Sequence, residues 1–260
     1  MKKYLLFAWL SAQEIVEYRV NFFWRVAGTI VSTLVLYVFW VAVLGTGFGT
    51  HYYNTQTIGL YYLFIILVQT LTNPEIYRVA NRIYSGDLTI DILKPYSFTA
   101  KVIVESIPEK LLQAFIIILI FLLLQTIGVK HSLTWEQAEL ALVALFLAWV
   151  GKFFIGLLLS SLAFWFNRIH GFESLIWNIG GLLSGEIIPI VFLPKILLDT
   201  SVFLPFRYWL YFPAQLLLGK VTKPEVVNGF IWQIVWIIIF LILSSVMWKK
   251  GLKSFEGVGR

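Results

Sequence analysis

The sequence of 260 residues is 59% hydrophobic and only 13% charged, and its mean hydropathy is +0.83. Soluble domains carry roughly 25% charged residues, so this composition excludes an ordinary water-soluble fold and indicates an integral membrane protein. The chain has no cysteine, which excludes disulfides, thiolate metal sites and a cysteine nucleophile. The net charge of +6 does not indicate nucleic-acid binding, because the basic residues flank hydrophobic stretches.

The N-terminal segment, residues 1–20, has Leu5, Trp9 and Val16 on one helical face and acidic residues elsewhere. This pattern predicts an amphipathic helix that lies along the membrane surface; a frayed polar leader is the alternative. Lysines before an apolar run imitate a secretory signal, but Gln13 and Glu14 follow without a cleavage site, so we expect the segment to be retained.

Six stretches are long and apolar enough to cross a bilayer, which requires about 20 residues. They lie at 22–45, 57–78, 106–128, 137–166, 174–193 and 226–248. Pro74 is expected to kink or end the second helix. The sequence therefore predicts an all-α integral membrane protein with six transmembrane helices in a single domain, residues 1–260.

Lys and Arg are distributed unevenly between the connecting segments. With the N-terminus inside, the inner segments 1–20, 78–101, 167–173 and 249–260 hold 12 basic residues, whereas the outer segments hold five. Basic residues accumulate on the cytoplasmic side, so both termini are predicted to be cytoplasmic in a multi-pass protein of the plasma membrane.

The largest inner loop, residues 80–101, contains a glycine turn at Gly86 and a stop at Pro95. Asp87 is expected to cap a short helix that begins at Leu88. Leu88, Ile92 and Leu93 would form a small apolar face, which needs a protein partner or lies on the lipid head groups.

Two ionisable residues fall within predicted spans, where they usually face a cavity or a partner. Glu186 is predicted to line a substrate path or gate, or else to pair with Arg207 or a backbone amide. The sequence leaves open whether Lys152 pairs with Glu186. Gly181 and Gly185 form a small-residue pair that permits close helix packing, either within the bundle or at a dimer seam.

The largest outer segment, residues 194–225, is too apolar around 203–213 for a free loop. We expect it to re-enter the membrane as a hairpin packed against protein, which would satisfy its backbone groups.

No catalytic apparatus is evident from the sequence. A phosphate-binding loop, a zinc-protease motif and a serine-hydrolase elbow are all missing, and the three histidines are widely separated. We therefore expect no enzyme activity, no cofactor and no metal site.

The run from Gly86-Asp87-Leu88 to Leu93-Lys94-Pro95 resembles the loop between the second and third spans of type-2 ABC exporter permeases. It is closest to an uncharacterised permease family of similar length. Other pieces lie in register with that family: the amphipathic N-terminus, residues 185–194, residues 204–219 and the basic tail from Lys249.

The resemblance implies a six-span half-transporter that pairs with a second permease, the same or homologous, and with two cytosolic ABC ATPases. It implies coupling to the ATPase through Gly86, Asp87, Leu88, Asp91, Ile92, Lys94 and Pro95. The implied gate or pathway comprises Glu186, Pro189, Pro205, Arg207 and Pro213. An aromatic-rich, weakly charged bundle suits export of an amphipathic or lipid-like substrate.

Three alternatives differ in class. A stand-alone secondary transporter would show an internal repeat, and we find no convincing one between 1–130 and 131–260. A membrane-embedded enzyme would need convergent polar groups. A permease-like subunit in signalling or self-immunity is indistinguishable from an exporter by sequence.

Overall fold

The computed structural model describes residues 2–74, 76–126, 128–129 and 131–255. Within these residues the fold is all-helical, with no strand. Five helical segments are long and apolar enough to span a membrane: α2 (Arg19–Gly45), α3 (Thr55–Thr72), α6 (Phe98–Thr126), α7 continued by a 3-10 turn (Trp135–Phe164) and α12 (Lys223–Ser254). Shorter helices join them: α1 (Lys2–Glu17), α4 (Ile76–Tyr84), α5 (Leu88–Leu93), α8 (His170–Leu183), α9 (Lys195–Ser201), α10 (Pro205–Trp209) and α11 (Tyr211–Leu218).

Local signals explain where three of the long helices begin and where one of them ends. Asn54 before α3 and Thr134 before α7 each form a reciprocal capping box with the third helical residue. Glu225 accepts bonds from the backbone N–H and the hydroxyl of Thr222 at the start of α12, at 2.8 and 2.7 Å. These bonds satisfy backbone donors that a first helical turn leaves open. The α3 helix ends at Thr72, just before Pro74, as the proline predicts.

The structure differs from the prediction of six continuous spans at residues 174–193. Only the 14-residue helix α8 forms there, and the chain then bends through Gly185 and Pro189. Fourteen residues rise about 21 Å, which is shorter than a bilayer core of about 30 Å. Gly185 has a φ of +83°, a conformation that side-chain-bearing residues rarely adopt, so the helix breaks where the glycine permits it.

The bent segment after α8 is held by aromatic donors from two other helices. The hydroxyl of Tyr61 donates to the carbonyl of Gly185, and that of Tyr62 donates to the carbonyl of Ile187 at 2.9 Å. The indole of Trp40 on α2 donates to the same Ile187 carbonyl at 3.2 Å. The side chains thus satisfy carbonyls that a broken helix leaves without partners.

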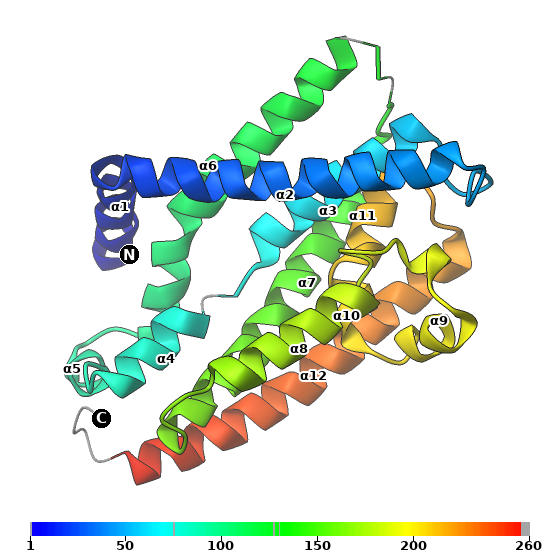
Figure 1. Cartoon of the computed structure of the whole chain (residues 1–260). Helices are drawn as coiled ribbons and strands as arrows, with labels where there is room; N and C mark the ends of the chain where they lie inside the picture. The colour runs from blue at the N-terminus through cyan, green and yellow to red at the C-terminus, as the bar shows by residue number, and fades with distance from the viewer. Residues whose placement is uncertain (1, 75, 127, 130, 256–260) are drawn as a thin grey trace.

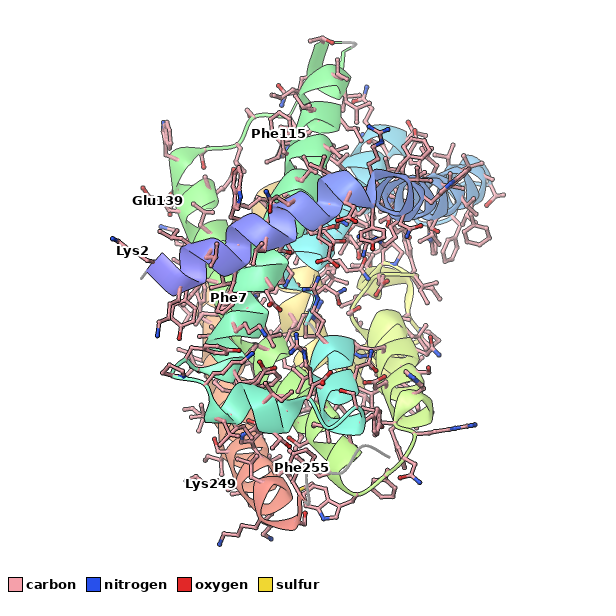
Figure 2. All side chains as sticks on the ribbon, turned by 90° about the vertical axis from the view of Figure 1, so that its left-hand side faces the viewer. Lys2, Phe7, Phe115, Glu139, Lys249 and Phe255 are labelled. Atoms are coloured by element: carbon pink, nitrogen blue, oxygen red, sulfur yellow. The ribbon has the colours of Figure 1, made fainter. Side chains whose placement is uncertain are left out.

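The helices place the predicted inner and outer segments at opposite ends of the molecule. In Figure 1, α1, α4, α5, the start of α8 and the end of α12 lie toward the left. The turn after α2 and the segment around α9 lie at the right, and the α6–α7 connection is at the top. Figure 2 looks onto the end that carries α1, α4 and α5. The segments that the count of basic residues assigns to one side of the membrane thus lie together, away from the segments that it assigns to the other side.

The core lies around α3 and α7. The α3 helix is the most enclosed of the five: 56% of the residues in its most apolar stretch are buried, compared with 6% in α2. The α12 helix packs along α7, and α11 packs against both α7 and α3. Gln233 of α12 is fully buried and donates to the carbonyls of Ala144 and Tyr208 at 3.0 and 2.8 Å, which ties three helices together.

The apolar segment predicted to re-enter the membrane is folded as two short helices, α10 and α11, that meet at Leu210. Pro205, Trp209 and Pro213 are buried in it. Arg207 donates to the hydroxyl of Ser201 at 3.3 Å and lies over the ring of Tyr211.

The aromatic donors yield a testable prediction. Tyr61→Phe removes the bond to the Gly185 carbonyl and leaves a buried acceptor open, so we expect destabilisation by about 0.5–2 kcal/mol. The measurement is the thermal midpoint of the detergent-purified protein.

Tyr52→Phe is the matched control, because the Tyr52 side chain is exposed in the turn after α2. It should leave the midpoint unchanged. An unchanged midpoint in Tyr61→Phe would mean that this bond does not hold the bent segment.

Candidate functional site

The predicted coupling loop is a short structured unit at the end of the molecule that carries α1 and α4. Gly86, with a φ of +79°, turns the chain out of α4. Asp87 precedes α5 as predicted, but its carboxylate accepts from the hydroxyl of Ser85 at 2.8 Å and makes no cap bond to the helix. Leu88 is fully buried in an apolar cluster with residues of α4, α6 and the 3-10 turn Leu162–Phe164. The buried leucine fixes α5 to three neighbouring elements.

Asp91 is the centre of a polar network beneath α5. Its side chain is 1% exposed and accepts from Arg82 at 2.6 Å, from the Tyr96 hydroxyl at 2.7 Å and from Lys101 at 3.1 Å. Burial by itself raises the pKa of the Asp91 carboxyl, but the bonds from Tyr96 and Lys101 and the charge of Arg82 outweigh it, and the pKa lies below its usual value. Burial and the bond to Asp91 raise the pKa of Tyr96 to about 12.

The exposed face of α5 differs from the predicted one. Leu88 and Asp91 point inward, so neither is available to a partner protein. Ile90, Ile92 and Leu93 are 53%, 48% and 81% exposed. Lys94 and Pro95 follow on the same exposed stretch, and the Pro95 carbonyl accepts from Lys3 of α1 at 3.4 Å. The prediction placed Leu88 on the outer face because a six-residue helix has too few positions for periodicity to separate its two sides.

Helix α1 lies against α6 beside this loop. Ser11 donates to the Glu105 carbonyl at 2.6 Å, and the ring of Phe7 packs edge-on against that of Tyr96. The apolar face predicted to meet lipid points away from the protein, with Leu5, Trp9 and Val16 between 63% and 71% exposed.

A stripe of polar residues on α6 leads from the Asp91 network into the bundle. Lys101, Glu105 and Glu109 recur every four residues, the spacing that places side chains on one helical face. Lys101 lies 3.8 Å from Glu105, and Glu109 pairs with Arg25 of α2 at 3.1 Å. The side chains of Glu105 and Glu109 are only 18% and 20% exposed.

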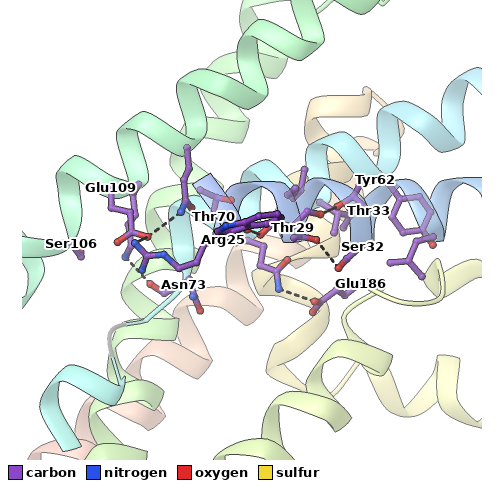
Figure 3. A pocket seen from close by; sticks show the side chains of 18 of the residues that line it. Arg25, Thr29, Ser32, Thr33, Tyr62, Thr70, Asn73, Ser106, Glu109 and Glu186 are labelled. Carbon is purple, nitrogen blue, oxygen red and sulfur yellow. Dashed lines mark hydrogen bonds and ion pairs between the residues drawn. The ribbon is translucent and has the colours of Figure 1, made fainter. Parts of the chain in front are cut away.

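The stripe ends at a cavity of about 750 Å³ between α2, α3 and α6. Its polar lining comprises Arg25, Thr29, Ser32, Thr33, Tyr62, Gln69, Thr70, Asn73, Arg78, Ser106, Glu109, Lys110, Gln113 and Glu186. Figure 3 shows Arg25 and Glu109 toward one end of the cavity and Glu186 toward the other. Polar side chains on apolar spans are stable only against water, protein or a ligand, so this cavity is the best candidate for a polar path.

Glu186 lies where the bent segment meets α3. Gln69 donates to its carboxylate at 2.7 Å, and Glu186 is not paired with Arg207. It also lines a second cavity, of about 310 Å³, which holds Lys152. Within the described residues no ion pair joins Lys152 to Glu186.

The small-residue pair packs inside the bundle. A Cβ at Gly181 would meet the Glu186 carboxylate at 3.3 Å, and one at Gly185 would collide with the Tyr61 hydroxyl. Both glycines are buried, which accounts for them without a dimer seam.

Sequence reasoning missed the polar face of α2, which lines the larger cavity through Gly28, Thr29, Ser32 and Thr33. Their three- and four-residue spacing within an apolar span was the available signal. A metal site is not indicated: within the described part of the chain, no three His, Cys, Asp or Glu side chains form a group able to hold an ion.

Comparison with known proteins places the chain in a family. The sequence profile of the family described as "ABC-2 family transporter protein" matches residues 30–259. A search of curated proteins gives no match. Because the profile covers most of the chain, including residues 84–95, the smaller cavity and four of the five long helices in full, the protein belongs to the ABC-2 family of membrane transporter subunits.

Proposed function

We propose that this protein is the membrane-spanning half of an ABC exporter that moves an amphipathic or lipid-like substrate outward. Two copies of a separate cytosolic ATPase hydrolyse ATP, and a second permease, the same or homologous, completes the pathway. Both termini lie in the cytoplasm. The observation that carries the proposal is the α6 stripe, which joins the network under α5 to the polar cavity.

The inner end suits transmission of force. A coupling element must be joined rigidly to the spans that it moves, since packed elements shift as units. Leu88 and Asp91 hold α5 against α4 and α6, while Ile90 and Leu93 offer apolar contact to a partner. The ATPase therefore docks on this exposed face, and not on the face predicted from sequence, which included the buried Leu88.

The remaining segments receive corresponding roles. The outward apolar side of α1 rests in the inner lipid interface. The α8 helix and the bent segment together make the fifth crossing, and α9 to α11 form the outer re-entrant gate, with Pro189, Pro205, Arg207 and Pro213 at its bends and contacts. The α2 helix, which is little buried, borders the larger cavity on the side available to a second permease.

ATPase docking is tested by Leu93→Asp in protein purified from native membranes under mild detergent. A carboxylate in an apolar interface is costly to desolvate, so recovery of the ABC ATPase, quantified by mass spectrometry, should fall at least about tenfold.

Ile196→Asp is the matched control, because Ile196 is 75% exposed on α9 at the opposite end. It should leave ATPase recovery unchanged. Wild-type protein that recovers no ABC ATPase would contradict the proposal and favour a stand-alone transporter.

The Asp91 network predicts a pH dependence. The folded-state pKa lies below the unfolded value, so the stabilisation by Asp91 is present above about pH 4 and is lost as pH falls through the folded-state pKa. Asp91→Asn should lower the free energy of unfolding at pH 7 by about 2–3 kcal/mol, and the deficit should shrink below about pH 4.

The thermal midpoint as a function of pH measures this effect. Asp87→Asn in the same loop is the control, because Asp87 is exposed; its change should stay within about 0.5 kcal/mol. A deficit for Asp91→Asn that did not depend on pH would rule out the charge as its cause.

A further inference from the structure

Lys152 is a buried cation within the candidate span Trp135–Phe164. Its side chain is 7% exposed, and the nearest aromatic contact is the ring of Trp177, with the ammonium 5.9 Å from the ring centre. No described carboxylate lies within ion-pairing distance of the ammonium. The charge of Glu186, on the wall of the same cavity, acts on the ammonium but makes no direct ion pair with it. Burying an ammonium without a counter-ion in contact is costly, and a single tryptophan face offsets only part of that cost.

The cavity beside Lys152 is of a size that holds a ligand group. At about 310 Å³ it lies at the lower end of small-molecule sites. Asn178, Ser184 and Gln69 supply amide and hydroxyl groups to its wall, and Trp177, Phe206 and Trp209 supply aromatic surface. Concave sites with a few convergent polar groups among aromatic side chains are the usual form of a binding pocket.

We propose that this cavity binds the anionic head group, a phosphate or carboxylate, of a single-chain or lipid amphipath, with the Lys152 ammonium as its counter-ion. The anion completes the charge that Lys152 lacks, and the amide and hydroxyl groups donate to its remaining oxygens. The apolar chain of the ligand leaves the head group toward the aromatic wall.

Glu186 refines the class of ligand. Its carboxylate lines the same cavity, so it repels a second negative charge there and favours a head group with a single negative charge or with a neighbouring amine. Because Glu186, Gln69 and Asn73 line both cavities, a ligand released from Lys152 enters the larger polar cavity next.

This inference rests on the proposed function only in making the ligand a transported molecule; binding itself requires no ATPase. The test therefore uses the purified full-length permease alone in detergent. The probes share one acyl chain and differ in head group: lysophosphatidylglycerol, lysophosphatidylethanolamine, a fatty acid and a neutral monoacylglycerol. Native mass spectrometry gives the dissociation constant of each.

We expect wild-type protein to bind the probes with anionic oxygens at least about tenfold more tightly than the monoacylglycerol. Lys152→Met should abolish that preference, Lys152→Arg should retain it, and Glu186→Gln should strengthen binding of the fatty acid. Lys195→Met, an exposed lysine of α9, is the control and should leave all constants unchanged.

Equal binding of all four probes by wild-type protein, or an intact preference in Lys152→Met, would overturn the proposal. If Lys152→Met fails to fold, the wild-type series and Glu186→Gln still decide it. If both phosphate probes bind more tightly than the fatty acid, the site recognises a phospholipid head group. If these three probes bind equally well, and all more tightly than the monoacylglycerol, the site recognises the anionic oxygens that they share.

Discussion

Inside a bilayer a chain that leaves the helical path must supply partners for its own backbone, because water is absent. This constraint shapes the region after α8. Tyr61, Tyr62 and Trp40 donate to the carbonyls of the bent segment and hold it against α3 and α2. The bend in turn brings Glu186 to Gln69 and to the edge of both cavities. The three donors and Gln69 together position the acidic side chain in the bundle.

The same requirement for partners holds for buried charge at the end of the molecule that carries α4 and α5. Asp91 is buried because it accepts three charge-assisted or hydroxyl bonds, and it thereby fixes the orientation of α4, α5 and α6 relative to one another. The outer surface of α5 is consequently apolar and rigidly mounted. The polar stripe that begins with Lys101 continues to Glu109 at the larger cavity, so side-chain contacts link α5 through α6 to the cavity wall.

Much of this fold follows from the sequence by length and hydropathy alone, because a spanning helix needs a long apolar run and five of the six predicted spans are long helices in the structure. The span predicted at 174–193 is not one continuous helix, since hydropathy does not detect a bend that a positive-φ glycine and distant tyrosines make possible. The start of α5 at Leu88 was predictable from turn chemistry, although Asp87 makes no cap bond to the helix. The burial of Leu88 and Asp91 was not, because it depends on contacts with α6 and the 3-10 turn far along the chain. The cavity on α2 was readable in Thr29 and Thr33 only through their spacing.

The central claim is that α5 docks an ATPase through Leu93 while Leu88 faces inward. The cysteine-free chain permits single-cysteine variants, each treated in native membranes with a short thiol-to-amine cross-linker. Leu93→Cys should cross-link to an ABC ATPase, and Leu88→Cys, buried at that position, should not. Cross-linking from Leu88→Cys but not from Leu93→Cys, or from neither, would contradict the account.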